Sequence, residues 1–381
     1  MLSNCLSGLR VLDLSQYIPG PFCTLMLSDL GAEVVKVEPP AGDPMRSFPG
    51  PTDADGISSL YKVLNRNKTV IRLDLKQPAE GQALAALVAK ADMLMESFRP
   101  GTLERLGFGQ QRLRNLNPRL VHCALSGYGQ TGPYRLRAGH DVTYVALTGL
   151  LAAGNGGQGP VLDFPPLADH AGAMQATNAI LAALFRRERT GQGAYLDISL
   201  FESALSWSYL SLGRRDIAGG RDMLNGGAAW YRIYRTADER YFAFAPIEEK
   251  FWKAFCAAIQ RPDFVARHGE PMPQSALIAD LEILFAGKTL AEWTALLDPA
   301  DCCFEPIVEP YEVAGHPHVR ERGLIREGAD GIADILMPCL SDGEAPPERR
   351  PLVEAEAGAV MERWVQSGFR FGGNAIRPSS V

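Results

Sequence analysis

Three titratable residues stand where a helix or a strand is expected to begin or end. His140 precedes a helical pattern, Asp169 precedes a long apolar helix, and Glu248 separates a strand-like run from an amphipathic helix. Histidine exchanges protons near neutral pH, and a carboxyl group does so when burial raises its pKa. These residue types suit acid–base catalysis, and a carboxylate also suits nucleophilic catalysis.

Each of these residues alone also has a structural interpretation. A single histidine is more often structural than catalytic. Asp169 could be the N-cap of the helix that follows it, a role that contributes about 1 kcal/mol. Glu248 could stabilise the positive end of the helix that begins near Lys250. The residue types therefore do not define a site without their wider context.

Two further sequence patterns suggest binding sites but lack the sequence context that such sites require. Residues 127–132 match the dinucleotide-binding pattern G-x-G-x-x-G, but Pro133 follows directly and no apolar helical pattern starts there. We interpret this segment as a turn or a loop beside a ligand. Cys302 and Cys303 lie near two histidines but lack zinc-site spacing, so we expect no metal.

The composition is that of a globular enzyme-sized protein. The chain has 381 residues, 46% of them hydrophobic and 22% charged, with a formal net charge of -6. This balance argues against nucleic-acid binding, which needs clustered Lys and Arg. Apolar runs stay below the about 18 residues of a membrane span. Because the N-terminus lacks a secretion signal and the seven cysteines are scattered, we expect a cytoplasmic protein with reduced thiols and no membrane partner.

The elements that must position these residues alternate between strands and helices. Six apolar runs predict strands, at residues 10–15, 33–38, 69–75, 92–96, 119–125 and 194–200. Helical periodicity occupies residues 22–30, 79–91, 142–151 and 172–187. This alternation predicts an α/β fold with a doubly wound, Rossmann-like parallel sheet in a large domain, residues 1–226.

A change of pattern near residues 219–227 predicts a second domain. Residues 230–235 and 241–245 form a predicted antiparallel pair, and amphipathic helices follow at residues 250–259, 274–285 and 290–297. We therefore expect a small α+β domain at residues 227–320. The segment 321–381, which ends in a Gly/Ser/Pro-rich stretch, is expected to return to the large domain.

Five segments make the sequence similar to a known family. They are PGPFCTLMLSDLGAEVVKVE (19–38), NRNKTVIRLDLK (65–76), ESFRPGTLERLGFG (96–109), LSGYGQTGPY (125–134) and RRERTGQGAYLDISL (186–200). These segments resemble the family III CoA-transferases, also called the CaiB/BaiF family, and the resemblance covers nearly the whole chain. It implies an enzyme that acts on a coenzyme A thioester and needs no cofactor beyond the CoA moiety of its substrate.

Within the family, two segments are most similar to alpha-methylacyl-CoA racemases. They are AGHDVTYVALTGLL (138–151) and PPLADHAGAM (165–174). The resemblance implies that His140 and Asp169 are the two proton-handling residues of a racemase that acts through an enolate, and that Glu248 orients His140. MLNGGAAWY (223–231) is also similar to a racemase segment.

The resemblance leaves two alternatives open. The transferases of the family share the aspartate as a nucleophile, and Pro39 stands where racemases commonly have an arginine. VEPPAGDPMR (37–46) is closer to the transferases. A CoA-transferase that works through an aspartyl-CoA thioester therefore remains possible, and an inactive CoA-binding scaffold is the third hypothesis.

The resemblance also implies where CoA binds and how the chains assemble. The expected CoA-binding residues are Leu73, Asp74, Leu75, Lys76, Phe98, Arg99, Arg105, Gly139 and Tyr144. The family forms an interlocked homodimer, in which the large domain of one subunit and the small domain of its partner meet at the active site. In such a dimer Glu248 would act on His140 of the other chain.

Overall fold

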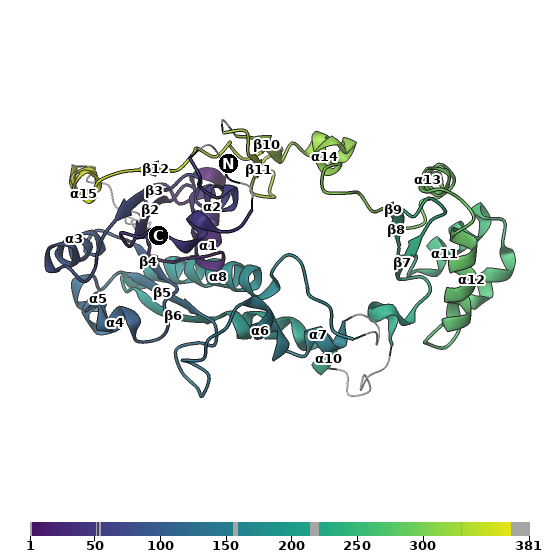
Figure 1. The fold of residues 1–381 in the computed structure, drawn as a ribbon, viewed down its shortest axis with the longest axis horizontal. Coiled ribbons are helices and arrows are strands. Elements are labelled where there is room, and N and C mark those ends of the chain that lie inside the picture. The colour runs from purple at the N-terminus through teal and green to yellow at the C-terminus, as the bar shows by residue number, and fades with distance from the viewer. Residues whose placement is uncertain are drawn as a thin grey trace, which may run out of the picture. The chain divides into compact units, whose positions relative to one another are not determined.

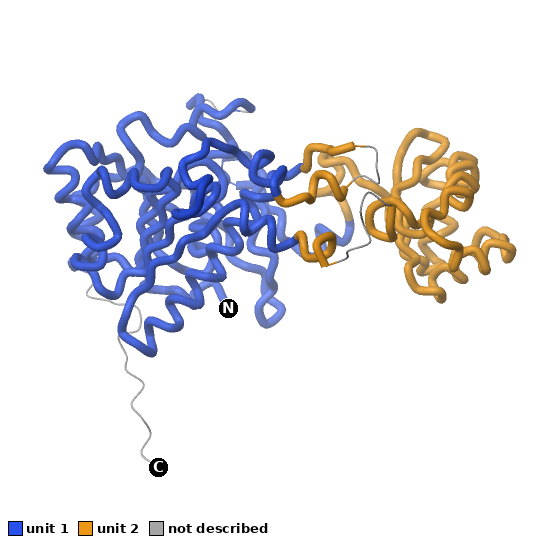
Figure 2. The backbone as a smooth tube through the Cα atoms, turned by 90° about the horizontal axis from the view of Figure 1, so that it is seen from below, with its two compact units in different colours: residues 1–147, 164–207, 317–381 blue, residues 148–163, 208–316 orange. Residues whose placement is uncertain are grey.

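The structure, a computed structural model, describes residues 2–50, 52, 55–154, 159–213, 221–328 and 330–366. The chain divides into two compact units (Figure 2). Unit 1 comprises Met1–Leu147, Phe164–Trp207 and Pro317–Val381, and unit 2 comprises Thr148–Asp163 and Ser208–His316. None of the described helices combines the length and the apolar character needed to cross a bilayer.

Unit 1 is built on a parallel sheet that, in the described residues, has seven strands in the order β12-β3-β2-β1-β4-β5-β6 (Figure 1). All neighbouring strands pair parallel, which confirms the predicted α/β parallel sheet. The strands are β1 (Arg10–Asp13), β2 (Glu33–Glu38), β3 (Thr69–Arg72), β4 (Met93–Glu96), β5 (Val121–Ser126), β6 (Ala194–Ser199) and β12 (Val353–Glu354).

Helices cover both faces of this sheet. Strands β1, β4 and β5 are buried at every residue, as parallel strands between two helical layers usually are. Helices α1 (Pro19–Asp29) and α8 (Leu167–Thr190) pack on one face. The other face shares a hydrophobic core with α3 (Pro78–Val88), α4 (Thr102–Arg105), α5 (Gln110–Leu116) and α15 (Ala357–Gln366).

The strand order reverses direction at β1. From β1 the chain proceeds outward to β2 and β3, and then returns to place β4 on the other side of β1. The loops that leave the carboxyl ends of β1 and β4 therefore diverge. Such a point is where open α/β sheets bind their ligands.

Unit 2 contains an antiparallel sheet of β7 (Arg232–Arg235), β8 (Tyr241–Phe244) and β9 (Phe304–Pro306). The pairing of β7 with β8 confirms the predicted hairpin. Helices α11 (Glu249–Ala258), α12 (Ser275–Phe285) and α13 (Leu290–Leu297) enclose an aromatic core with this sheet. The sequence did not reveal β9, because that strand is short and ends in a proline.

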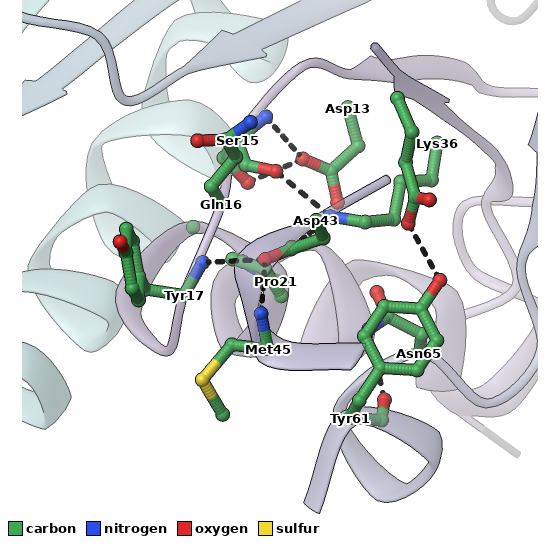
Figure 3. Close-up of polar contacts among 12 residues, drawn as sticks. Asp13, Ser15, Gln16, Tyr17, Pro21, Lys36, Asp43, Met45, Tyr61 and Asn65 are labelled. Carbon is green, nitrogen blue, oxygen red and sulfur yellow. Dashed lines mark hydrogen bonds and ion pairs between the residues drawn. The ribbon is translucent and has the colours of Figure 1, made fainter. Parts of the chain in front are cut away.

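Buried charges gather at the carboxyl end of β1 (Figure 3). The Asp13 carboxylate accepts hydrogen bonds from the Ser15 and Thr24 hydroxyls and, at 3.1 Å, from Lys68 Nζ. Lys36 Nζ donates to the Ser15 carbonyl at 2.8 Å and lies 2.9 Å from Asp43 Oδ2. Both lysines and both aspartates are at most 2% exposed, so two positive and two negative charges balance inside the fold.

The balance of this charge cluster decides the ionisation of Asp13. Burial alone would raise its pKa, but the charges of Lys68 and Lys36 together with the hydroxyl hydrogen bonds lower it to about 2. Asp13 is therefore ionised at neutral pH and depends on its cations.

We predict that Lys68→Met lowers the free energy of unfolding by about 3–5 kcal/mol, because it leaves a buried carboxylate without its closest cation. Urea unfolding of the purified variant measures the change. Lys90→Met, which removes an exposed lysine, is the matched control and should shift the free energy of unfolding by less than about 0.5 kcal/mol. Equal stability of the two variants would show that the cluster does not hold the fold.

Candidate active site

Two loops meet at the diverging carboxyl ends of β1 and β4. The Gln16 backbone N–H, after β1, donates to Ser97 Oγ, after β4, over 2.9 Å. Tyr17 follows with a positive φ of 63°, a conformation that is uncommon for a residue with a side chain and that often occurs at functional sites. Tyr17 is also near His140, with ring centroids 6.1 Å apart in an edge-to-face arrangement.

His140 is the N-cap residue of the short helix α6 (Asp141–Ala146). Its backbone is extended, its N–H donates to Thr143 Oγ1 over 3.0 Å, and its side chain is exposed. The prediction of one continuous helix at residues 142–151 is wrong, because the segment forms two helices. The chain turns at Gly149, with a φ of 81°, before the separate helix α7 (Leu150–Ala153).

Asp169 lies inside the first turn of α8 and not before the helix. Pro166 is the N-cap residue and Leu167 is the first helical residue, so the N-cap interpretation of Asp169 is wrong. A proline restricts its own φ and thereby favours a helix start at this point, which the apolar periodicity did not reveal. A carboxylate in the first turn still interacts favourably with the helix dipole.

A hydrogen bond connects the two helix starts that carry His140 and Asp169. The Asp141 carboxylate, one residue after His140, accepts the Asp169 backbone N–H over 3.0 Å. This bond holds the two candidate bases in one neighbourhood. It also removes the Asp169 N–H from the donors that this helix start could offer to a ligand.

The surroundings of Asp169 raise the pKa of its carboxyl group to near neutral pH. Burial is the main cause that raises its pKa, and the nearby negative charge of Asp141 raises it further, to about 7. Asp169 can therefore exist with or without its proton at physiological pH. The sequence alone did not reveal this influence of Asp141.

Tyr144 and Gly139 form one packed corner of the site. The Tyr144 hydroxyl donates to the Gly139 carbonyl over 2.6 Å. A Cβ atom at Gly139 would lie 2.6 Å from the Tyr144 ring, so only glycine fits there. Burial raises the pKa of Tyr144 to about 12, Asp169 contributes to that rise and Arg99 opposes it. Tyr144, Asp169 and Arg99 thus belong to one electrostatic environment.

The other predicted CoA-binding residues follow the ends of β3 and β4. Leu73 is buried, whereas Asp74 accepts the Lys76 backbone N–H over 3.1 Å in a turn that leaves the lysine side chain exposed. Leu75 packs at the margin of the core, as does Phe98. Arg99 and Arg105 are exposed, and Arg105 Nη2 donates to Thr102 Oγ1 over 2.8 Å.

Glu248 belongs to unit 2, where it is the N-cap residue of α11. Its side chain is exposed and makes no capping hydrogen bond, while its carbonyl accepts the Phe251 and Trp252 N–H groups. The pairing of Glu248 with His140 stays a prediction. Across the described residues there is no group of three or more His, Cys, Asp and Glu side chains that suits a metal ion.

Comparisons with known proteins agree on one family. The sequence model described as CoA-transferase family III matches residues 6–350. The alpha-methylacyl-CoA racemase of Homo sapiens is 34% identical over 94% of this chain and 93% of its own. The acetyl-CoA:oxalate CoA-transferase of Acetobacter aceti is 33% identical over 93% of this chain and 94% of its own.

A solved structure has the same fold. The CAIB/BAIF family protein from Brucella suis superimposes with a TM-score of 0.81 at 26% identity, and the match covers 94% of this chain and 99% of that one. The members to which this chain is similar are racemases or CoA-transferases, which are both enzymes. The chain is therefore an enzyme that belongs to CoA-transferase family III.

Proposed function

We propose that this enzyme racemises a 2-methylacyl-CoA thioester by proton transfer through an enolate. The observation that carries the proposal is the hydrogen bond from the Asp169 N–H to Asp141, which connects the helix starts of two candidate bases. The pKa of Asp169, raised by burial and by Asp141 to about 7, supports a role in proton transfer.

In this mechanism two bases act on opposite faces of one carbon. The first base takes the α-proton, so that the C–H bond breaks and its electron pair enters the enolate. The second base gives a proton to the other face, which restores the thioester with the inverted configuration. His140 and Asp169 take these two roles and exchange them in the reverse direction.

CoA lies along the segments that follow β3 and β4. The exposed cations Lys76, Arg99 and Arg105 suit its phosphates as charge-assisted donors. No cofactor beyond the CoA moiety takes part, because side chains carry out both proton transfers.

A CoA-transferase is the second candidate, favoured by the similarity to the Acetobacter aceti enzyme. In this mechanism the Asp169 carboxylate attacks the thioester carbonyl, expels CoA thiolate and forms a mixed anhydride. The thiolate then attacks the Asp169 carbonyl, releases the first acid and leaves an aspartyl-CoA thioester. An acceptor carboxylate repeats these two steps in reverse order and takes CoA away.

We predict that the wild-type enzyme incorporates solvent deuterium at the α-carbon of a 2-methylacyl-CoA, because an enolate returns with a proton from an exchangeable group. His140→Ala should reduce this exchange about 100-fold or more, the usual effect of losing a positioned acid–base residue. Mass spectrometry of the recovered thioester in deuterated water measures the exchange.

The wild type, His140→Ala and Asp169→Asn separate the candidate functions when they are assayed for CoA transfer between acids. Transfer needs the Asp169 nucleophile and should survive His140→Ala, whereas Asp169→Asn should abolish both reactions. Rapid transfer without deuterium incorporation would refute the racemase and favour the transferase. Full activity of Asp169→Asn in both assays would remove Asp169 from the site.

The pH dependence tests the influence of Asp141. The rate that requires ionised Asp169 should rise with pH through about 7. Asp141→Asn removes the negative charge but keeps an oxygen that accepts the Asp169 N–H, so the pKa of Asp169 should fall and this midpoint should move to lower pH. Profiles of kcat/KM against pH measure the shift, and an unchanged midpoint would contradict the assigned cause.

We further propose an interlocked homodimer in which Glu248 of the partner subunit orients His140. The resemblance to the family supports this arrangement, and so does the exposed Glu248 side chain without a capping bond. Threaded chains cannot separate without unfolding. Light scattering should therefore give the mass of a dimer at every dilution, and a compact monomer would contradict the proposal.

A further inference from the structure

A polar cavity of about 540 Å³ opens on the sheet of unit 1 beside β5 and β6. Its wall includes Glu96, Glu104, Gln110, His122, Gln130 and Tyr195. The strand register pairs Leu94 with His122 and His122 with Tyr195, so these side chains share the sheet face that carries α4 and α5. Strands β4, β5 and β6 and helices α4 and α5 supply most of the cavity wall, and the turn at residues 107–109 together with Gln130 completes it.

His122 is buried without a hydrogen-bond partner. It is 6% exposed, and neither ring nitrogen has a partner within the described residues. The ring of Tyr195 in the neighbouring strand β6 meets the His122 ring edge to face, with ring centroids 4.9 Å apart. Burial lowers the pKa of His122 to about 4, so the ring is neutral and offers one donor and one acceptor. Because buried polar groups nearly always have hydrogen-bond partners, the unpartnered ring nitrogens of His122 indicate that a bound molecule completes their hydrogen bonds.

Glu96 supplies a buried carboxyl group on the same wall. It is also 6% exposed, and its Oε2 accepts the Phe98 backbone N–H over 2.7 Å. No cation lies within ion-pair distance of Glu96 or Glu104 in the described part of the chain. Burial and the carboxylate of Asp197 together raise the pKa of Glu96 to about 7.

Among the described residues of this cavity wall, Arg112 is the only arginine or lysine, and it is already engaged. Arg112 donates to the Gly107 carbonyl over 2.8 Å and stacks over the Phe108 ring at 4.9 Å. The cavity therefore presents carboxylate oxygens and a neutral imidazole to an occupant. This lining favours a positively charged group with several N–H donors.

We propose that this cavity binds a small organic primary ammonium ion, with its ammonium group between Glu96 and His122. An ammonium group carries three donors and one positive charge, which match the free carboxylate oxygen of Glu96 and the imidazole lone pair. A volume near 540 Å³ is in the range of small-metabolite sites. A metal ion fits less well, because the described residues hold no group of three or more ligating side chains.

The site has a connection to the proposed CoA-binding segment. Glu96 holds the Phe98 N–H, and Phe98 and Arg99 are expected to contact CoA. An ammonium ion keeps Glu96 ionised and so strengthens this hydrogen bond. The ammonium ion and CoA should then influence each other's affinity by the same factor. The binding of the ammonium ion itself does not rest on the proposed function.

Isothermal titration calorimetry with 1,4-diaminobutane tests the site on the full-length protein at pH 7. We expect saturable binding of the diamine and none of 1,4-butanediol, which has the same length without charge. His122→Phe and Glu96→Gln should each weaken binding about ten-fold or more, as the loss of one charge-assisted hydrogen bond does. Glu282→Gln, which removes an exposed carboxylate of unit 2, should bind as the wild type does.

A second measurement separates this cavity from general surface binding. Because the ammonium ion lowers the pKa of Glu96, binding near pH 7 should release protons, and the observed heat should differ between phosphate and HEPES buffers. Circular dichroism and CoA affinity of His122→Phe show whether that variant is folded. No binding to the wild type, or equal binding to wild type and both cavity variants, would overturn the proposal.

Discussion

The carboxyl end of β1, beside which the candidate site lies, depends on the ion pair between Asp13 and Lys68. Asp13 ends β1, and Lys68 directly precedes β3, which is two strands away in the sheet. Lys68 also donates a hydrogen bond to the Pro21 carbonyl in α1, and Lys36 forms an ion pair with Asp43. Because these groups are buried, each must keep its partner, and the turn after β1 is thereby fixed. That turn carries Tyr17 to the vicinity of His140.

Neighbouring charges shift the pKa of Asp169 in the opposite direction from that of Asp13. At Asp13 opposite charges lower a pKa, whereas at Asp169 a carboxylate of the same sign raises it. The first arrangement fixes an ionised group as part of the framework. The second keeps a carboxyl group near the point where it can gain or lose a proton. The fold therefore separates the charge that holds it together from the charge that is suited to chemistry.

The fold was more predictable than the site because periodicity depends on burial alone. The runs that became β4 and β6 were evident, since buried strands have continuous or regular apolar patterns. The start of α8 was misplaced, and the two-residue strand β12 was missed because it is too short to show a period. The burial of Lys36, which lies within a strand-like run, and of Lys68, which directly precedes one, was likewise not evident.

The site residues themselves came from their resemblance to a family and not from local pattern. The spacing of residues 141 and 169 does not indicate that the carboxylate of one accepts the N–H of the other, since they lie 28 positions apart in the chain. The orphaned His122 was equally invisible, because a histidine in a strand has the same local pattern whether or not it has a partner. Such properties arise only when distant segments meet.

The pairing of β12 with β3 has a consequence for the way the chain is made. Val353 joins Thr69, and Arg349 holds Asp29 through two hydrogen bonds, although unit 2 is encoded between these partners. During synthesis, β3 therefore stays an open sheet edge until residues 353–354 have left the ribosome. An open parallel edge is a template for wrong pairing, and contacts of this sequence separation form slowly. The nascent chain therefore carries this risk of aggregation until residues 353–354 have been made and can cover the edge.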